Sequence, residues 1–557
     1  MRPSLAAGIV CAGLLAGCTV GPDFLRPDPP RDKSYLSDPA ADATVAVPDV
    51  LGGEAQRFVT DLDIPAQWWQ VYQSRAMNGL IEQALRANPD IQSAIQGLKA
   101  AQAMAQAQRA ALFPLVTASG SGTHNQQSSA ISPIPSNGAT IFGLFTGLLN
   151  VTYLLDLWGG TRRAAESLEA QAEAQCFVLE AAYLTLSSNV VVAAVAEASL
   201  RGQIAATERT IAIQRESLAL LQRRLAIGQS SRADVAAQET ALAQSESSLP
   251  PLRNLLSQQR HLLAQLTGRT TAHVPAETFE LSGLALPVEL PVTLPSRMVE
   301  QRPDIRSAEA GVHAAGAQVG VQTAALLPQV TLGLGYGSTA TSLDTLFSDT
   351  LGPTMTVGAG VVHTLLDGGA LFAQRKAAIA AWEQSKAQYR STVLTAFRNV
   401  ADTLRALEFD AMTLQAAANA ERSARLSLDI TRRRQTAGDA GILEVLNAEL
   451  TYQQASLALI QARAARFADT AALFQALGGG WRNRDPDGKA GPARRATCKA
   501  PTNPPKPQPW PDSKTQNQPD PPAPTPRDDI MPAATNGGAP TPAKPARGLW
   551  SWLTGGS

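Results

Sequence analysis

The stretch Arg302-Pro303-Asp304-Ile305 decides the fold, because Asn88-Pro89-Asp90-Ile91 is a near copy of it earlier in the chain. In both copies a second proline, Pro114 or Pro328, follows 25 residues after the first. Further pairs keep the same order at an offset between 209 and 214: Leu155-Asp156 with Leu366-Asp367, Gly228 with Gly438, Val235 with Val445, and Ala264-Gln265-Leu266-Thr267-Gly268 with Gln475-Ala476-Leu477-Gly478-Gly479. So many ordered pairs indicate an internal duplication.

Each half is expected to begin with a helix and to continue with two strands. The first helix covers about 90–112 and carries Pro-Asp in its first turn, which suits a helix N-terminus. Alternating apolar residues then predict strands with one apolar face: Val151, Tyr153, Leu155 and Leu157, then Val330, Leu332, Leu334 and Tyr336, then Met355, Val357, Ala359 and Val361. Residues 114–123 are a weaker fourth candidate. Transmembrane barrels need at least eight strands, so several chains must contribute.

A very long helical hairpin follows the strands in each half. Residues 161 to about 227 contain no proline, and a helix of ~67 residues is roughly 100 Å long. The return helix starts at about 233, and its apolar residues recur every seven positions, as they do before the turn: Ile204, Ile211, Leu218 and Leu225, then Val235, Leu242, Leu249, Leu256 and Leu263. Sustained heptads predict coiled-coil packing rather than an amphipathic helix on a globular core. Pro250-Pro251 should break or kink the return helix. The second hairpin covers 370–437 and about 442–477.

The N-terminus predicts export and lipidation. Residues 1–17 carry one positive charge and a short apolar run, as a signal peptide does. Leu15-Ala16-Gly17-Cys18 is typical of a lipobox, whose cysteine thiol receives a diacylglycerol; the alternative is an ordinary signal peptide with an incidental cysteine. Thr19, rather than Asp, follows the cysteine, which favours sorting to the outer membrane. No later segment reaches about 20 uninterrupted apolar residues, so no conventional transmembrane helix is expected.

The remaining segments complete the predicted domain plan. After the signal peptide come a lipidated strap at 18–64, the first repeat at 65–269, an equatorial linker at 270–293 and the second repeat at 294–481. The tail, 482–557, holds 17 prolines in 76 residues and few apolar side chains. Such a composition cannot bury a core and predicts disorder or polyproline II.

Composition and motifs argue against other classes of protein. The chain has 557 residues with 47 Lys+Arg and 47 Asp+Glu, and a neutral chain is not expected to bind nucleic acid by neutralising phosphates. No GxxxxGK[ST], GxSxG or HExxH motif occurs, and the five histidines are not spaced for a shared metal, so we expect no enzyme and no metal site. Cys176 lies among Ala and Leu and is most simply a buried small apolar residue.

Several of these motifs resemble a known family. Pro65-Ala66-Gln67-Trp68-Trp69, Asn88-Pro89-Asp90-Ile91, Arg302-Pro303-Asp304-Ile305-Arg306 with Ala308-Glu309, and Cys18-Thr19-Val20-Gly21-Pro22-Asp23 are similar to outer-membrane efflux factors of the TolC/OprM-like family. The opening is similar to the NodT-type lipoprotein branch. The resemblance covers about 18–481.

The resemblance implies a mainly α fold with a β-barrel part. Three chains would form one twelve-stranded outer-membrane barrel, four strands from each, continued by a coiled-coil α-helical barrel across the periplasm. An equatorial girdle would combine parts of 19–64, 270–295 and the segment near 480. The function implied is a passive exit duct that docks on a periplasmic adaptor and an inner-membrane pump of the resistance-nodulation-division (RND) type and passes drugs or other small toxic compounds. The alternatives are a duct for type I protein secretion and a structural lipoprotein without a pore. No cofactor is implied beyond the lipid on Cys18.

The mechanism is expected to reside at the two hairpin tips. Gly228 and Gly438 suit left-handed caps that end the outgoing helices. The residues expected to contact the adaptor are Gly228, Arg232 and Asp234 at the first tip, and Gly438 and Asp439 at the second. Asp234 and Glu444 have an alternative role as acidic residues at the start of a helix, where the dipole favours them.

The periplasmic gate is placed by resemblance at Leu443, Glu444 and Asn447. A ring of three carboxylates at a narrow mouth would attract cations, and close like charges would raise their pKa values. Relatives often carry Asp where Asn447 stands, so a second charged ring is not expected here. Arg432, Arg433 and Arg434 are candidates for pairing with a neighbouring hairpin in the closed state, or else form a solvated helix end.

Overall fold

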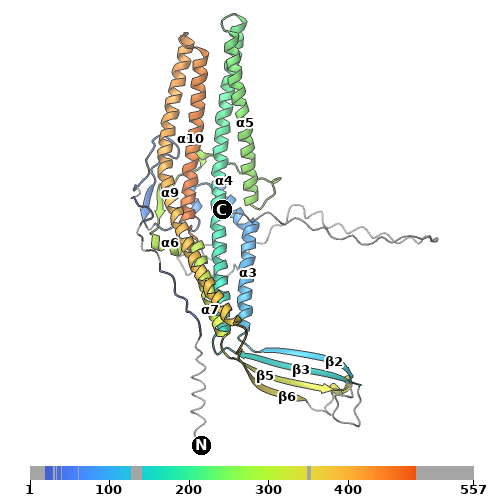
Figure 1. Cartoon of the computed structure of the whole chain (residues 1–557). Helices are drawn as coiled ribbons and strands as arrows, with labels where there is room; N and C mark the ends of the chain where they lie inside the picture. Colours follow the sequence, from blue (N-terminus) through green and yellow to red (C-terminus); the bar gives the residue numbers. More distant parts are fainter. Residues whose placement is uncertain are drawn as a thin grey trace, which may run out of the picture. The chain divides into compact units, whose positions relative to one another are not determined.

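The computed structural model describes residues 19–28, 30, 32, 34–38, 41–60, 62–126, 141–347 and 353–483 (Figure 1). The predicted signal peptide, the lipidation candidate Cys18 and all of the predicted Pro-rich tail except its first two residues lie outside this part of the chain.

The same series of elements occurs twice. Each half has a helix of 22 residues, two strands, a helix of 67 or 68 residues and a return helix of 35 residues. In the first half these are α3 (Pro89–Ala110), β2 (Leu115–Gln126), β3 (Ile141–Leu155), α4 (Gly160–Ala226) and α5 (Arg232–Leu266). In the second they are α7 (Pro303–Ala324), β5 (Gln329–Ala340), β6 (Thr354–Val362), α9 (Ala370–Ala437) and α10 (Ile442–Ala476). The predicted hairpins are therefore present, and β3 begins ten residues before the first residue singled out for it in the sequence, Val151.

Short elements precede, separate, interrupt and follow these repeats. They are β1 (Arg57–Thr60), η1 (Trp68–Tyr72), α2 (Arg75–Ala87), η2 (Leu281–Gly283), β4 (Glu289–Val292), α6 (Pro295–Gln301), α8 (Leu343–Leu346) and η3 (Trp481–Asn483).

The duplicated Leu-Asp and Gly-Gly pairs build the junction from strand to long helix. The carboxylate of Asp156 accepts from two amides in the first turn of α4, at 3.0 and 2.9 Å. Asp367 does the same at the start of α9, at 2.9 and 2.7 Å. The preceding Gly159 and Gly369 have φ values of 76° and 87°, a left-handed conformation that L side chains rarely adopt. The aspartate satisfies orphan amides at a helix start, which explains why this motif occurs in both halves.

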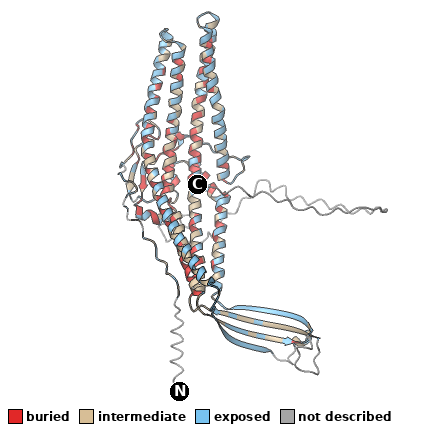
Figure 2. Ribbon diagram, viewed as in Figure 1, coloured by how far each residue is buried: buried red, intermediate tan, exposed pale blue. Residues whose placement is uncertain are grey.

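The long helices pack as two hairpins, α4 with α5 and α9 with α10, and α10 also contacts α4 (Figure 1). Buried residues form a seam along the inner faces, while the outer faces stay exposed (Figure 2). In the first hairpin the predicted heptad positions Ile211, Val235 and Leu263 are buried. The heptad pattern therefore identifies the contact face correctly.

The prediction that Pro250-Pro251 would break the return helix is wrong. Helix α5 runs through both prolines. Proline removes amide donors from the helix ladder, but α5 packs along α4, with Ser245 buried before the pair and Leu263 buried after it. Two exposed ion pairs also join the helices here. Arg215 binds Glu246 at 2.6 Å before the prolines, and Arg253 binds Glu208 at 2.8 Å after them.

The four long strands form one antiparallel sheet in the order β2-β3-β5-β6. Its register aligns apolar side chains across the strands, because directly paired residues share a face. One row is Val116, Val151, Leu334 and Val357; the next is Ala118, Leu149, Tyr336 and Met355. The row between them, on the opposite face, is Thr117, Asn150, Gly335 and Thr356. One face of the sheet is thus mostly apolar, and the other carries mostly Thr, Gly, Ser and Asn, with Leu115, Leu148 and Leu154 among them. Strands β2 and β6 are the edge strands.

A second sheet joins distant parts of the chain at the middle of the helices. Strands β1 and β4 pair in parallel. Next to them the side chain of Arg466, from α10, is fully buried. Its guanidinium donates to the carbonyls of Gly52 at 2.6 Å and Glu54 at 3.0 Å, and to Gln56 Oε1 at 3.0 Å. Segments from 41–60, 289–292 and α10 therefore form one equatorial unit.

The residues after Cys18 run along the helices as an extended strap. The Val20 amide donates to the Trp158 carbonyl at 3.0 Å, and Asp23 pairs with the buried Arg163 at 2.6 Å. A Cβ on Gly21 would collide with Gly320 of α7, so the two backbones touch. The strap is therefore fixed within two residues of the lipidation candidate.

Two sequence expectations need correction. Cys176, in α4, is buried as expected, but it is disulfide-bonded rather than a simple apolar residue. Helix α4 also contains a window long and apolar enough to cross a membrane by length and composition. Half of that window is buried inside the chain, and Val190, Val191 and Ala194 belong to the hydrophobic core. We therefore interpret α4 as a core helix.

Candidate functional site

The first hairpin tip is shaped by backbone capping. Gly228, with φ 76°, ends α4, and the Gln229 amide donates to the Arg224 carbonyl at 2.7 Å. Ser231 begins α5 through a reciprocal capping box with Asp234, at 3.1 and 3.0 Å. The amide and hydroxyl of Ser231 hold the pKa of Asp234 below its usual value. Asp234 therefore has a structural role as a helix cap.

The second tip has a similar backbone but weaker capping. Gly438, with φ 88°, ends α9, and the Asp439 amide donates to the Arg434 carbonyl at 2.8 Å. Gly441 precedes α10 and has no side chain to cap it, so only the long 3.4 Å contact from its amide to Glu444 Oε1 remains. Glu444 is less tied to its own helix than Asp234, although the two occupy equivalent positions.

The three consecutive arginines each pair with an acid of their own hairpin. Arg432 binds Glu449 at 2.8 Å, Arg433 binds Asp429 at 2.7 Å, and Arg434 binds Glu444 at 3.4 Å. Arg434 also donates to the Asp439 carbonyl at 3.0 Å and so crosses the tip. Glu449 differs from the other acids because its side chain is only 5% exposed. The sequence does not indicate this charge pair between α9 and α10, because Glu449 resembles any surface acid of a helix there.

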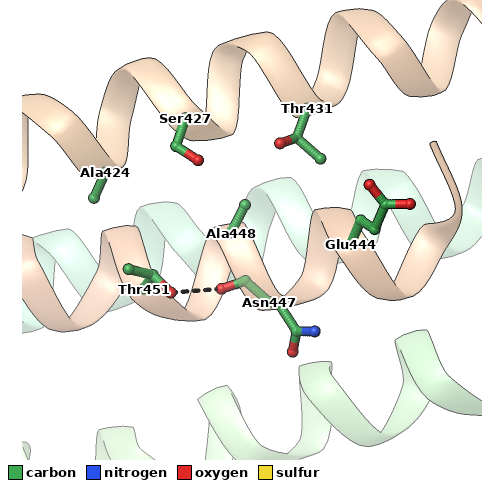
Figure 3. A pocket seen from close by; sticks show the side chains of 7 residues that line it. All are labelled: Ala424, Ser427, Thr431, Glu444, Asn447, Ala448 and Thr451. Carbon is green, nitrogen blue, oxygen red and sulfur yellow. Dashed lines mark hydrogen bonds between the residues drawn. The ribbon is translucent and has the colours of Figure 1, made fainter. Parts of the chain in front are cut away.

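A groove of about 350 Å³ lies between α9 and α10 close to the second tip (Figure 3). Small and hydroxyl residues of α9 face it, together with Glu444 of α10. Asn447 points its side-chain amide away from α9, and its backbone carbonyl accepts from the Thr451 hydroxyl at 2.8 Å (Figure 3). The full lining is Ala424, Ser427, Thr431, Glu444, Asn447, Ala448 and Thr451.

The structure gathers the predicted site residues at the two tips. Gly228 and Arg232 lie at the first, and Gly438, Asp439, Leu443, Glu444 and Asn447 at the second; all are exposed in the single chain. Asp234, which caps α5, is half-buried there. Leu443 is 63% exposed, unusual for a leucine beside a buried seam. Leu443 and Asp439 are thus exposed at this tip, whereas Glu444 is exposed but already paired with Arg434.

Comparison with known proteins shows to which protein family the chain belongs. The family model for outer membrane efflux proteins matches residues 80–269 and 294–479. The probable efflux pump outer membrane protein TtgC of Pseudomonas putida is 30% identical over 487 residues, 86% of this chain and 96% of the relative. The pyoverdine export outer membrane protein OpmQ of Pseudomonas putida is 28% identical over 428 residues, 75% of this chain and 89% of the relative. The solved structure of the outer-membrane channel OprN has a TM-score of 0.73 and 26% identity, and covers 83% of this chain and 100% of its own.

The fold and the hairpin tips define a channel-type protein, and the chain belongs to the outer membrane efflux protein family. The resemblance inferred from its motifs is confirmed. Its place is the outer membrane of a Gram-negative bacterium, with helices that extend into the periplasm, and its function is that of an exit duct in efflux.

Proposed function

We propose that three copies of the chain form one continuous duct, a twelve-stranded barrel in the outer membrane joined to an α-helical barrel in the periplasm. The observation that carries this proposal is the two-faced sheet. Its apolar rows are exposed in the single chain, with Met355 and Val357 each 67% exposed. Lipid would cover that face, and the Thr, Gly and Asn face would line water.

The two edge strands supply the means of closure. Strands β2 and β6 each pair on one side only, and such edges are prone to join another chain. Pairing β6 of one copy with β2 of the next removes every edge, as a membrane requires. The exposed apolar residues of α9, including Leu394, Phe409 and Leu426, would be covered by neighbouring helices in the same assembly.

Neighbouring residues of β6 provide a matched test. Val357→Arg places a charge on the apolar face, where arginine costs about 2–4 kcal/mol at the bilayer midplane. Thr356→Arg places it on the opposite face. We expect Val357→Arg to abolish trimers in outer-membrane fractions, and Thr356→Arg to keep them and change single-channel conductance. Equal loss for both variants, or electron micrographs of the wild type without three-fold particles, would contradict the proposal.

We further propose that the second tip is the gate. Leu443, Glu444 and Asn447 would face the three-fold axis, with Glu444 forming a ring of carboxylates. The weak capping of α10 supports this role, because Glu444 makes only a 3.4 Å contact with its own helix start. The adaptor would bind around Gly228 and Gly438, including Arg232, Asp234 and Asp439, and move the second hairpin outward.

Asp234 serves as the control for the gate. It occupies at the first tip the helix-capping position that Glu444 occupies at the second, but it is not part of the proposed ring of carboxylates. Glu444→Ala should raise the single-channel conductance of the purified protein, whereas Asp234→Ala should loosen the first tip and leave that conductance unchanged. If both variants change conductance alike, Glu444 acts as a cap and the gate proposal fails.

The remaining assignments concern anchor and partners. We propose that Cys18 carries the lipid, since Val20 is already fixed at the junction of strand and helix. An RND pump and its adaptor are the proposed partners, and drugs or other small toxic compounds the proposed cargo, in line with the names of relatives such as TtgC. Mass spectrometry of the mature N-terminus, and antibiotic susceptibility of a deletion strain complemented with Cys18→Ser, test the anchor.

A further inference from the structure

The duplication makes the four long helices two equivalent pairs, α4 with α9 and α5 with α10. The glycines that precede the outgoing helices, Gly159 and Gly369, are 210 residues apart, and so are Gly228 and Gly438 at their far ends. Helices α5 and α10 begin and end at the same offset. Each residue of the first hairpin therefore has an equivalent in the second, 210 positions further on.

Within one chain the two hairpins meet through α4 and α10. Three contacts define the register of these antiparallel helices: Gln461 donates to Gln203 Oε1 at 3.1 Å, Ser188 donates to Gln475 Oε1 at 2.8 Å, and Gly202 lies against Ile460. A Cβ on Gly202 would be 3.2 Å from the Ile460 side chain, so the two helices touch at this level.

The face of α9 that corresponds to this contact is open in the single chain. Helix α9 lies on the outer side of the second hairpin (Figure 1). Its Met412, the equivalent of Gly202, is 43% exposed, and its Phe409 is 57% exposed. Ser199, the equivalent of Phe409 on α4, is buried. A surface that is covered on α4 is thus apolar and uncovered on α9.

Helix α5 carries the complementary surface on the outer side of the first hairpin. The equivalents of Ile460 and Gln461 on this helix are Pro250 and Pro251, and both prolines are exposed. Proline destabilises a helix interior because it supplies no amide donor. Its ring is compact and apolar, however, so the pair suits a close contact with an apolar side chain. The prolines occupy on α5 the place through which α10 meets α4.

We propose that α9 of one copy packs against α5 of the next copy in the register of the α4–α10 contact, with Met412 on Pro250 and Thr413 on Pro251. This inference rests on the proposed trimer. In a closed ring of chains that each carry two equivalent hairpins, the contact between chains repeats the contact inside one. Inside the chain the outgoing helix contributes a glycine and the return helix an isoleucine. Between chains the outgoing helix contributes a flexible methionine and the return helix a compact ring.

Cysteine cross-linking of the full-length protein in outer-membrane fractions tests this register. A disulfide needs Cα atoms about 4.4–6.8 Å apart, which the double variant Met412→Cys/Pro250→Cys should provide between copies. After oxidation with copper phenanthroline it should migrate as covalent trimers without reductant and as monomers with it. Each single variant keeps the native cysteines and should give no covalent trimer. Met412→Cys/Asn254→Cys, displaced by about one helical turn, should cross-link much less.

Photochemical capture tests the same contact with both prolines in place. With p-benzoylphenylalanine in place of Met412, light should attach this position to a peptide that contains Pro250 of another copy. Equal cross-linking of the displaced pair, capture of a different segment, or no covalent trimer in samples whose micrographs show three-fold particles would overturn the contact and leave the duct in place. Micrographs without three-fold particles would overturn both.

Discussion

The charge pair between Arg432 and Glu449 joins α9 to α10, so removing it should make local opening of the second hairpin tip more frequent. Replacing Arg432 with Met keeps much of the aliphatic stem and removes the guanidinium. Glu449 is then left buried without a counter-charge, and its Oε2 already lacks a hydrogen-bond partner among the described residues. A hydrogen bond to a charged group contributes about 1.5–3 kcal/mol, so local opening of the tip should become about 10- to 150-fold more frequent.

Arg433→Met is the matched control on the same helix. Its pair with Asp429 is exposed on both sides, at 79% and 52%, and exposed pairs of this spacing contribute about 0.3–0.5 kcal/mol. That converts to about a twofold change in opening.

Amide hydrogen exchange measures both effects in the detergent-solubilised protein. Peptides covering the end of α9 and the start of α10 should exchange much faster in Arg432→Met and nearly normally in Arg433→Met. Glu449→Gln combined with Arg432→Met should recover part of the protection, because no charge is then left buried. Equal exchange in the two single variants would refute the reasoning.

Three further predictions concern the equatorial unit and the strap. Burial and a hydrogen bond with Asp469 raise the pKa of Asp410 from 3.8 to about 7, so the stability that this group contributes is present below about pH 4 and is lost as the pH rises through 7. Asp410→Asn should therefore make the melting temperature less dependent on pH between 4 and 7 and raise it at pH 8. A wild-type melting temperature that does not fall over this pH range would count against this. Arg466→Met orphans three buried acceptors at about 1 kcal/mol or more each and should lower the melting temperature clearly, whereas Arg57→Met, at an exposed pair, should not; similar melting temperatures would be contrary evidence. Gly21→Ala should detach the strap from α7 and speed proteolysis between residues 19 and 38, since its φ is 98° and a Cβ would strike Gly320; an unchanged digestion pattern would show that the close contact is dispensable.

Local sequence patterns determined the elements of this protein. Helix periodicity and the absence of proline from 161–227 and 370–437 define the two long outgoing helices, and the strict heptads of the first hairpin identify its contact face. Alternation and the Asp-Gly-Gly motif mark the strands and their junctions with the helices. These features depend on residues close to one another in the sequence, so they can be predicted without knowing which other segment packs against them.

Tertiary structure decided what depends on residues far apart in sequence. Helix α5 runs through Pro250 and Pro251 while it packs along α4, whose residues lie 31 and 45 positions away in sequence from those they contact. Arg466 and Glu449 look like surface charges in the sequence. Only packing shows that Arg466 is buried and hydrogen-bonded to neutral acceptors and that Glu449 is buried and paired with Arg432. Likewise, the alternation of Val116, Val151, Leu334 and Val357 predicts four half-apolar strands, but only the register places these residues in one row. Local sequence patterns determine which face of a helix or strand a residue occupies, whereas long-range packing determines what covers that face. The free-energy cost of a buried charge or of an unpaired sheet edge depends on that covering.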